Sequence, residues 1–451
     1  FGDDPWMRKR TVGKDGPVNI YEIHAGSWRR PSDGADDWYT YEELGERLVP
    51  YLKDRGYNYV ELMPLAEHPC DESWGYQTTG FFSPTSRYGT PTELYGFVEQ
   101  CHQNGIGVIM DFVPVHFAVD DYALWNYDGT ALYEYPNQDV GRSQWGSCNF
   151  MHSRGEVCSF LQSAANYWLT EFHFDGLRMD AISNMIYWQG DPARGENKGA
   201  VLFLQKLNRG LKQRWPSAML MAEDSTARPD VTRSADQGGL GFDYKWDMGW
   251  MNDSLSYFQA PPRERVEQYH KLTFSMQYYY EEDYLLPLSH DENVHGKATI
   301  LQKMNGDYDG KFPQARALYL YMYAHPGKKL NFMGGELGQL REWDEKRQQD
   351  WDILKYPGHD AFFRFMKDLN KLYGENPAFW QQDYDREGFR WLDCHQESRC
   401  IYAFERRCPS QRIAVAFNFS DREQKDYEMK VTGARSLTLL LDTDRDVYGG
   451  S

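Results

Sequence analysis

The feature that most constrains the fold is an alternation of short apolar runs with amphipathic helical stretches, from the N-terminus to about residue 380. The runs have the length of buried strands, and the stretches between them carry apolar residues at helical spacing, as in Leu44, Leu48 and Leu52. Eight runs are present, which is the number that a closed (β/α)8 barrel needs. The expected strands are 19–25, 59–65, 107–114, 174–181, 218–223, 242–248, 284–290 and 329–333.

The pattern changes near residue 389 to strands with no helix between them. We therefore expect a catalytic TIM barrel over 1–380 and a C-terminal antiparallel β-sandwich domain over 381–451. Some 40 residues at 118–158, rich in Asp, Tyr, Asn and Gly, are too long for an ordinary loop and predict a lid over the barrel mouth. Pro50 predicts an irregularity in the first helix. The five C-terminal strands are expected at 389–394, 400–404, 413–419, 427–431 and 436–441.

Composition restricts the partners and the compartment. A net charge of -18 argues against a nucleic-acid partner, which clustered Lys and Arg would bind. The sequence shows no apolar run of 18 residues and no signal peptide, so we expect no membrane contact. The seven cysteines are odd in number and scattered, which favours a reducing cytoplasm. We expect a monomer. Because the chain starts at Phe1 and five strands leave an open sheet edge, we expect it to be part of a longer protein.

Acidic residues end several of the expected strands. The third strand ends with Asp111 and His116 and the fourth with Arg178 and Asp180, while Glu223 ends the fifth and His290 and Asp291 the seventh. Barrel enzymes carry their chemistry at this end of the strands, so these groups should meet at one mouth. Carboxylates flanked by Arg and His suit glycosidic bond cleavage, which needs an anionic nucleophile and a proton donor. This chemistry requires no cofactor or metal.

Two other interpretations of these residues stay open. A single Asp at a strand end is more often a helix N-cap than a catalytic group, although four such strand ends together favour a site. A carboxylate cluster that holds a divalent cation is the competing functional interpretation.

At these residues the sequence resembles the α-amylase superfamily. The four short signature regions of that superfamily match 111–116, 176–180, 222–225 and 288–291, in the same order and at barrel spacing. The resemblance implies that Asp180 is the nucleophile, Glu223 the general acid and base, and Asp291 a carboxylate that holds sugar hydroxyls. It also implies substrate-binding roles for Tyr76, Asp111, His116, Arg178 and His290, with Tyr76 stacking under the sugar that is cleaved.

One departure narrows the resemblance to the glycogen branching-enzyme subgroup. The wider superfamily has Asn directly before the His of the first region, whereas Val115 stands there in this chain, as in the subgroup. The stretches 21–28, 61–64, 74–80, 241–246, 290–296 and 332–336 also resemble the subgroup. The resemblance implies cleavage of an α-1,4-glucan such as amylose or glycogen, and transfer of the non-reducing segment to a 6-hydroxyl.

Two positions differ from the subgroup, because Asp224 and Asn293 stand where Glu and Val are expected, and Asn293 is a candidate for altered acceptor contacts. The subgroup usually has an N-terminal carbohydrate-binding β-sandwich, and this sequence begins close to the barrel. A hydrolase of the same superfamily, such as a trehalose-releasing enzyme, is the alternative activity. A non-catalytic glucan-binding protein on the same fold is the alternative from another class.

Overall fold

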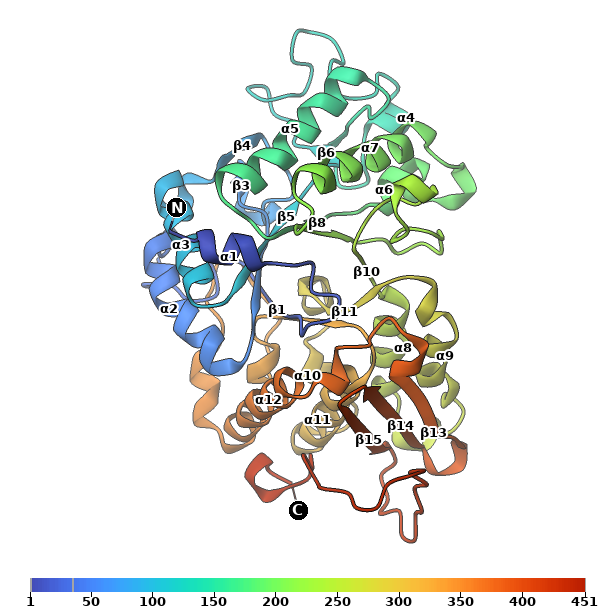
Figure 1. The fold of residues 1–451 in the computed structure, drawn as a ribbon. Coiled ribbons are helices and arrows are strands. Elements are labelled where there is room, and N and C mark those ends of the chain that lie inside the picture. Colours follow the sequence, from blue (N-terminus) through green and yellow to red (C-terminus); the bar gives the residue numbers. More distant parts are fainter. Residues whose placement is uncertain (1, 35, 451) are drawn as a thin grey trace.

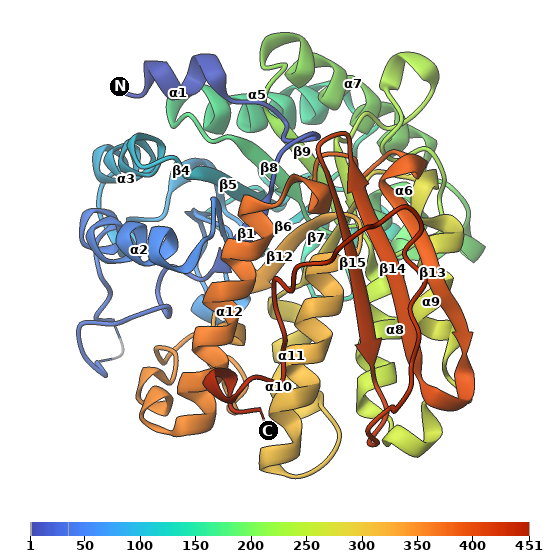
Figure 2. The same ribbon diagram turned by 60° about the horizontal axis from the view of Figure 1, so that its bottom comes forward.

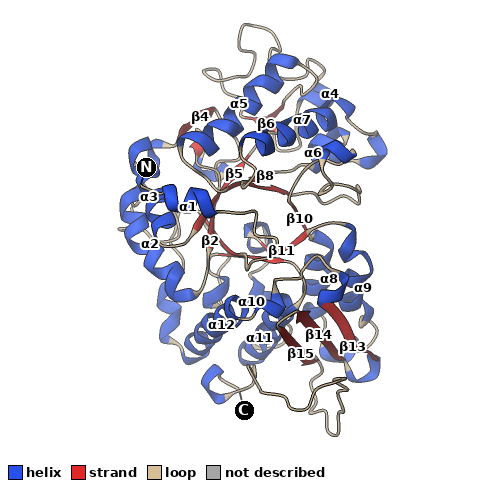
Figure 3. Ribbon diagram, viewed as in Figure 1, coloured by secondary structure: helices blue, strands red, loops and turns tan. Residues whose placement is uncertain are grey.

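A closed barrel of eight parallel strands forms the centre of the molecule. The computed structural model describes residues 2–34 and 36–450. Figure 3 shows the strands as a ring with helices around it. All eight predicted barrel strands are confirmed; seven are shorter than expected, and the last has the expected length but begins one residue earlier. They are β1 (Asn19–Ile23), β2 (Tyr59–Leu62), β5 (Gly107–Phe112), β8 (Gly176–Met179), β9 (Met219–Ala222), β10 (Tyr244–Trp246), β11 (Tyr284–Leu288) and β12 (Lys328–Phe332).

Helices follow most barrel strands and cover the outside of the barrel (Figure 1). A parallel sheet buried on both faces explains why the strands are nearly continuous apolar runs. The helices are α1 (Asp4–Lys9), α2 (Tyr41–Arg55), α3 (Pro91–Gln103), α4 (Gln138–Gly141), α5 (Gly155–Glu171), α6 (Ser183–Ile186), α7 (Lys198–Arg214), α8 (Met248–Gln259), α9 (His270–Tyr278), α10 (Ile300–Lys303), α11 (Tyr308–Ala324) and α12 (Pro357–Glu375).

Helix α2 shows how the sequence specifies one of these elements. Thr40 and Glu43 form a reciprocal capping box at its start, and Gly56 adopts a left-handed conformation, with φ of 84°, at its end. The helix runs through Pro50 without ending, so the expected irregularity does not interrupt it. The apolar stripe is buried at Leu44, Leu48 and Leu52.

The segment predicted as a lid leaves the barrel after β5. It is framed by an antiparallel pair, β6 (His116–Phe117) and β7 (Cys148–Asn149), and it contains α4. A second short pair, β3 (Ala66–Glu67) and β4 (Gly80–Pro84), lies in the loop after β2. Both inserted segments follow the carboxyl ends of barrel strands, which is the end of the barrel where the site was predicted.

The C-terminal part is an antiparallel sheet of three strands, β13 (Phe389–Gln396), β14 (Ile401–Cys408) and β15 (Gln411–Asn418). The sheet lies beside α8, α9 and α11 (Figure 2). On its apolar face, Tyr402 packs on Tyr257 of α8, and Phe417 packs on Tyr321 of α11. The strands expected at 427–431 and 436–441 are wrong, because both segments are irregular and the apolar Leu437 and Leu439 stay exposed. We propose that the two domains meet near residue 380, between α12 and β13.

Candidate active site

One buried arginine gathers three of the predicted carboxylates. Nη1 of Arg178 lies 2.8 and 2.9 Å from the two carboxylate oxygens of Asp111 and 2.8 Å from Oδ1 of Asp180. Nη2 lies 3.0 Å from Oε2 of Glu223, an ion-pair distance without the alignment of a hydrogen bond. The sequence predicted that these residues meet, and they share a single guanidinium.

The strand register explains why these side chains meet. Asp111 on β5 and Arg178 on β8 are direct neighbours in the sheet, and Asp180 and Glu223 directly follow β8 and β9. Ala181 then adopts a left-handed conformation, with φ of 48°, which a non-glycine residue rarely takes. In this conformation its N–H donates to Oε2 of Glu223 at 2.8 Å. The backbone after Asp180 thus orients the carboxylate of Glu223.

The shared guanidinium does not neutralise the whole cluster. Burial raises the pKa of Asp111 to about 6 even though Arg178 and the Tyr76 hydroxyl lower it. Burial and the neighbouring carboxylates of Glu223, Asp111 and Asp291 also raise the pKa of Asp180, against the opposing effect of Arg178. One guanidinium therefore does not keep every group of the cluster ionised, because three carboxylates compete for one cation.

His290 and Asp291 form a second charged pair at the mouth. Nδ1 of His290 lies 2.6 Å from Oε1 of Glu22 on β1, and its Nε2 lies 3.4 Å from Oδ1 of Asp291. Burial lowers the pKa of His290, but the carboxylates of Asp291 and Glu22 outweigh it and raise the pKa to about 10. Burial raises the pKa of Asp291, but the His290 and Arg178 charges outweigh it, and the net pKa is lowered. Asp291 is therefore an anion beside a cationic imidazole.

Tyr76 and His116 complete the predicted set. The Tyr76 ring stacks on His290 with centroids 5.5 Å apart, and its hydroxyl donates to Oδ2 of Asp111. Burial lowers the pKa of His116 to about 4, so this imidazole is neutral, and its Nδ1 contacts the Ser147 hydroxyl. His116 and His290 consequently differ in charge although both are buried.

A cleft of about 350 Å³ opens onto these residues. Six of the eight predicted site residues line it, while Asp111 and Arg178 lie buried beneath its floor. Several residues that line it were not predicted. These are Glu72, Ser73, Trp74, Gln77, Trp145, Ala181 and His295.

Two buried carboxyl groups near the site were also missed as site residues. Glu22 on β1 orients His290, and Glu61 on β2 is fully buried with no hydrogen-bond partner for either oxygen. Burial and the nearby charges of Glu22 and Asp111 raise the pKa of Glu61 well above its ordinary value, so it is a neutral acid. In the sequence, Glu22 and Glu61 each stand as a charged residue inside an expected apolar strand, and this is the signal that marks them as candidates.

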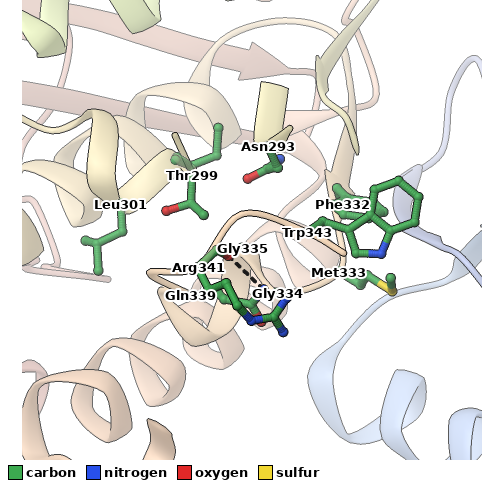
Figure 4. A pocket seen from close by; sticks show the side chains of 11 residues that line it. Asn293, Thr299, Leu301, Phe332, Met333, Gly334, Gly335, Gln339, Arg341 and Trp343 are labelled. Carbon is green, nitrogen blue, oxygen red and sulfur yellow. Dashed lines mark hydrogen bonds between the residues drawn. The ribbon is translucent and has the colours of Figure 1, made fainter. Parts of the chain in front are cut away.

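The two positions that differ from the subgroup do not line the cleft. Asp224 is buried, accepts from the N–H and hydroxyl of Thr226, and lies 3.3 Å from Nζ of Lys245. Asn293 donates through Nδ2 to the Ser289 carbonyl and faces a cavity of about 10 Å³, room for about one water (Figure 4). The candidate role of Asn293 in acceptor contacts is therefore not supported by its position.

Residues 2–34 and 36–450 contain neither a candidate metal site nor a candidate membrane span. Within these ranges no group of three or more His, Cys, Asp or Glu side chains could hold a metal ion. In the same part of the chain, no helix is both long and apolar enough to cross a bilayer.

Comparison with protein families gives two matches. Residues 41–139 match the alpha amylase catalytic domain, and residues 391–451 match the alpha amylase C-terminal all-beta domain. A crystal structure of alpha-amylase from Geobacillus thermoleovorans, complexed with acarbose, superposes with a TM-score of 0.68 at 18% identity and covers 91% of this chain and 88% of that chain. At this identity the likeness supports the fold alone.

Curated relatives are much more similar in sequence. The 1,4-alpha-glucan branching enzyme GlgB of Marinobacter nauticus is 44% identical, over 100% of this chain and 74% of the relative. The enzymes of the same name from Oleidesulfovibrio alaskensis and Fusobacterium nucleatum are 45% and 46% identical, each over 100% of this chain and over 73% and 74% of the relative.

Proposed function

The chain belongs to the 1,4-alpha-glucan branching enzyme family, and we propose that it cleaves an α-1,4-glucan and transfers the non-reducing segment to a glucan 6-hydroxyl in glycogen biosynthesis. Substrates of this kind are uncharged polymers, which suits a protein with a net charge of -18. The pair Asp180 and Glu223, held on one guanidinium at the floor of an open cleft, supports the cleavage step. The identity to branching enzymes over the whole chain carries the proposal of transfer.

The reaction proceeds in two displacements. The Asp180 carboxylate attacks the anomeric carbon while Glu223 gives its proton to the departing glycosidic oxygen, which frees the reducing-end piece. Glu223 then takes the proton of the acceptor 6-hydroxyl, whose oxygen displaces Asp180 from the anomeric carbon. Two inversions retain the α configuration. The carboxyl groups of a retaining pair lie about 5–5.5 Å apart, and the common contact with Arg178 supports such a short separation.

The contacts with Arg178 distinguish the roles of Asp180 and Glu223. Asp180 accepts an aligned hydrogen bond from Arg178, whereas the Glu223 contact with the same guanidinium is not aligned. A charge-assisted hydrogen bond favours the ionised form of its acceptor. Asp180 is therefore assigned as the nucleophile and Glu223 as the acid.

The remaining groups bind the sugar that becomes attached to Asp180. Asp291 accepts from sugar hydroxyls, His290 donates as a cation and His116 as a neutral imidazole. Tyr76 offers its ring to the apolar face of the sugar, while Asp111 holds Tyr76 and Arg178 in place beneath it. The lid at 118–158 narrows the cleft and disfavours attack by water.

We propose that the protein works as a cytoplasmic monomer. All seven cysteines are free thiols, which suits a reducing compartment. Size-exclusion chromatography with light scattering would measure the mass of the particle, and a dimer would contradict the proposal.

Treatment of amylose tests the reaction. Branching bleaches the iodine complex with few new reducing ends, because each cleaved bond is replaced by another glycosidic bond, and isoamylase then releases short chains from the product. A hydrolase releases one reducing end for every bond cut and leaves no side chains. Reducing ends that rise in step with bleaching, with no isoamylase-releasable chains, would refute the branching activity and leave the catalytic residues standing.

A further inference from the structure

An exposed tryptophan on the lid lines the catalytic cleft. Trp145 is 45% exposed, and it lies on the cleft wall with Asp180 and Glu223. Two other aromatic side chains of the lid, Tyr122 and Tyr127, are 69% and 63% exposed and do not line the cleft. The three rings differ in placement, since of these only the tryptophan lines the cleft.

A tight turn fixes the backbone on both sides of Trp145. Ser143 N–H donates to the Ser147 carbonyl at 2.9 Å, and Trp145 N–H donates to the Ser143 hydroxyl at 3.2 Å. Gly146 has a left-handed φ of 79°, which this turn requires. The hydroxyls of Ser143 and Ser147 are 2.5 Å apart. The ring is thus presented from a preorganised backbone, which lowers the entropy lost on binding.

The same turn is joined to two residues at the barrel mouth. The Ser147 hydroxyl contacts Nδ1 of His116, and the Trp145 ring centroid lies 5.4 Å from that of His116. The Trp145 carbonyl accepts from Nε2 of Gln77 at 3.2 Å, and Gln77 directly follows Tyr76. Trp145 therefore adjoins His116, and Gln77 connects it to the segment that carries Tyr76.

We propose that Trp145 is the stacking platform for a glucose unit of the donor glucan next to the cleaved bond. The proposal rests on the α-glucan substrate of the proposed function. The C–H face of a glucose ring is apolar, and an indole exposed in a polar cleft offers it the largest aromatic surface of any side chain. Because the unit that Trp145 contacts does not react, the contact is equally strong in the ground state and the transition state.

Removal of the ring should weaken substrate binding more than it slows the chemical step. Trp145→Ala should raise KM for amylose about 10-fold with a change in kcat below about 3-fold. Trp145→Phe, which keeps an aromatic face, should recover most of the loss. Tyr122→Ala is the matched control, as it removes an exposed ring of the same lid outside the cleft, and it should leave KM unchanged.

A binding measurement without turnover separates this proposal from the branching reaction itself. Maltoheptaose is titrated by calorimetry into Asp180→Asn and into the double variant Asp180→Asn/Trp145→Ala, with circular dichroism to confirm that both are folded. We expect Kd to rise about 10-fold in the double variant. A rise in Kd below 2-fold, or an equal rise in Asp180→Asn/Tyr122→Ala, would contradict the role of Trp145 as a stacking platform. If the wild type proves to be a hydrolase, the branching proposal fails while this measurement still decides the role of Trp145.

Discussion

The two ends of the barrel hold buried charge clusters of opposite balance. At the mouth, the carboxylates of Asp111, Asp180 and Glu223 share the guanidinium of Arg178. At the other end, the carboxylate of Asp383 lies 2.9 Å from Nζ of Lys328 and 2.6 Å from Nη2 of Arg406. The mouth has an excess of carboxylates, and the opposite end has an excess of cations.

The difference separates a functional cluster from a structural one. Burial raises the pKa of Asp383, but Lys328 and Arg406 outweigh it, so its net pKa is lowered and it stays ionised. Its partners come from β12 and β14, so the cluster joins the barrel to the C-terminal sheet. At the mouth, burial and the neighbouring carboxylates raise the pKa of Asp180 instead, and perturbed carboxylates of this kind are typical of reactive sites. Charge balance thus distinguishes a cluster that holds the fold from one that reacts.

The largest expected effect is on the mouth cluster. Asp180→Asn should reduce branching of amylose by more than about 10³-fold, because the amide has the same shape but is a poor nucleophile. The thermal midpoint should stay close to that of the wild type or rise, as one of three crowded carboxylates is removed. Near-normal turnover in a folded Asp180→Asn protein would contradict the assignment of the nucleophile.

The opposite result is expected at the far end. Asp383→Asn leaves two buried cations without a counter-ion and should lower the free energy of unfolding by about 3–5 kcal/mol, measured by urea denaturation, with kcat per folded molecule retained. Asp54→Asn breaks an exposed ion pair with Lys367 and serves as the control, with a loss below about 1 kcal/mol. Equal losses of unfolding free energy in the two variants would contradict a structural role for the Asp383 cluster.

Glu61 tests whether the mouth carries excess carboxyl groups at a cost to stability. Unfolded Glu61 titrates near 4.5, whereas the folded pKa is well above this value, so the folded state keeps a proton that the unfolded state releases. Above pH 4.5 the contribution of Glu61 to the free energy of unfolding therefore falls as pH rises, by at most about 1.4 kcal/mol per pH unit. Relative to wild type, Glu61→Gln should become more stable between pH 5 and 7, by about 2 kcal/mol. A pH-independent difference would show that Glu61 is ionised.

The smallest effect is expected outside both clusters. Asn293→Val introduces the residue expected from the subgroup and removes the hydrogen bond to the Ser289 carbonyl, which should cost about 1 kcal/mol. Because Asn293 faces the small cavity and not the cleft, the length of the transferred chains should not change. Debranching the product and sizing the released chains checks this. An altered distribution of chain lengths would support a role for Asn293 in acceptor binding.

The barrel and the reacting groups could be predicted because both have local signals. Each strand is an apolar run, and Asp180, Glu223 and Asp291 stand at strand ends in short motifs. The C-terminal sheet was predicted only in part, since alternating residues such as Leu437 and Leu439 form a strand only when a partner edge is available.

The rest of the site depends on contacts between distant segments. The pairing of Glu22 with His290 spans 268 positions, and nothing local reveals it. The same holds for Trp145, whose place on the cleft wall is set by the turn at 143–147 and by His116. Periodicity cannot distinguish an exposed ring at a cleft from one on an open surface, and Tyr122 and Trp145 look alike in the sequence.

Barrel closure also has a consequence for how the enzyme is made. The seam between β1 and β12 pairs Asn19 with Lys329 and Glu22 with Phe332. On the ribosome, every predicted catalytic residue emerges before β12 does, yet the barrel cannot close until that last strand has left the exit tunnel. A nascent chain therefore holds the complete set of reactive groups in an inactive arrangement. Glucan modification begins only after synthesis of the barrel is finished, so activity in a translation reaction reports that β12 has emerged.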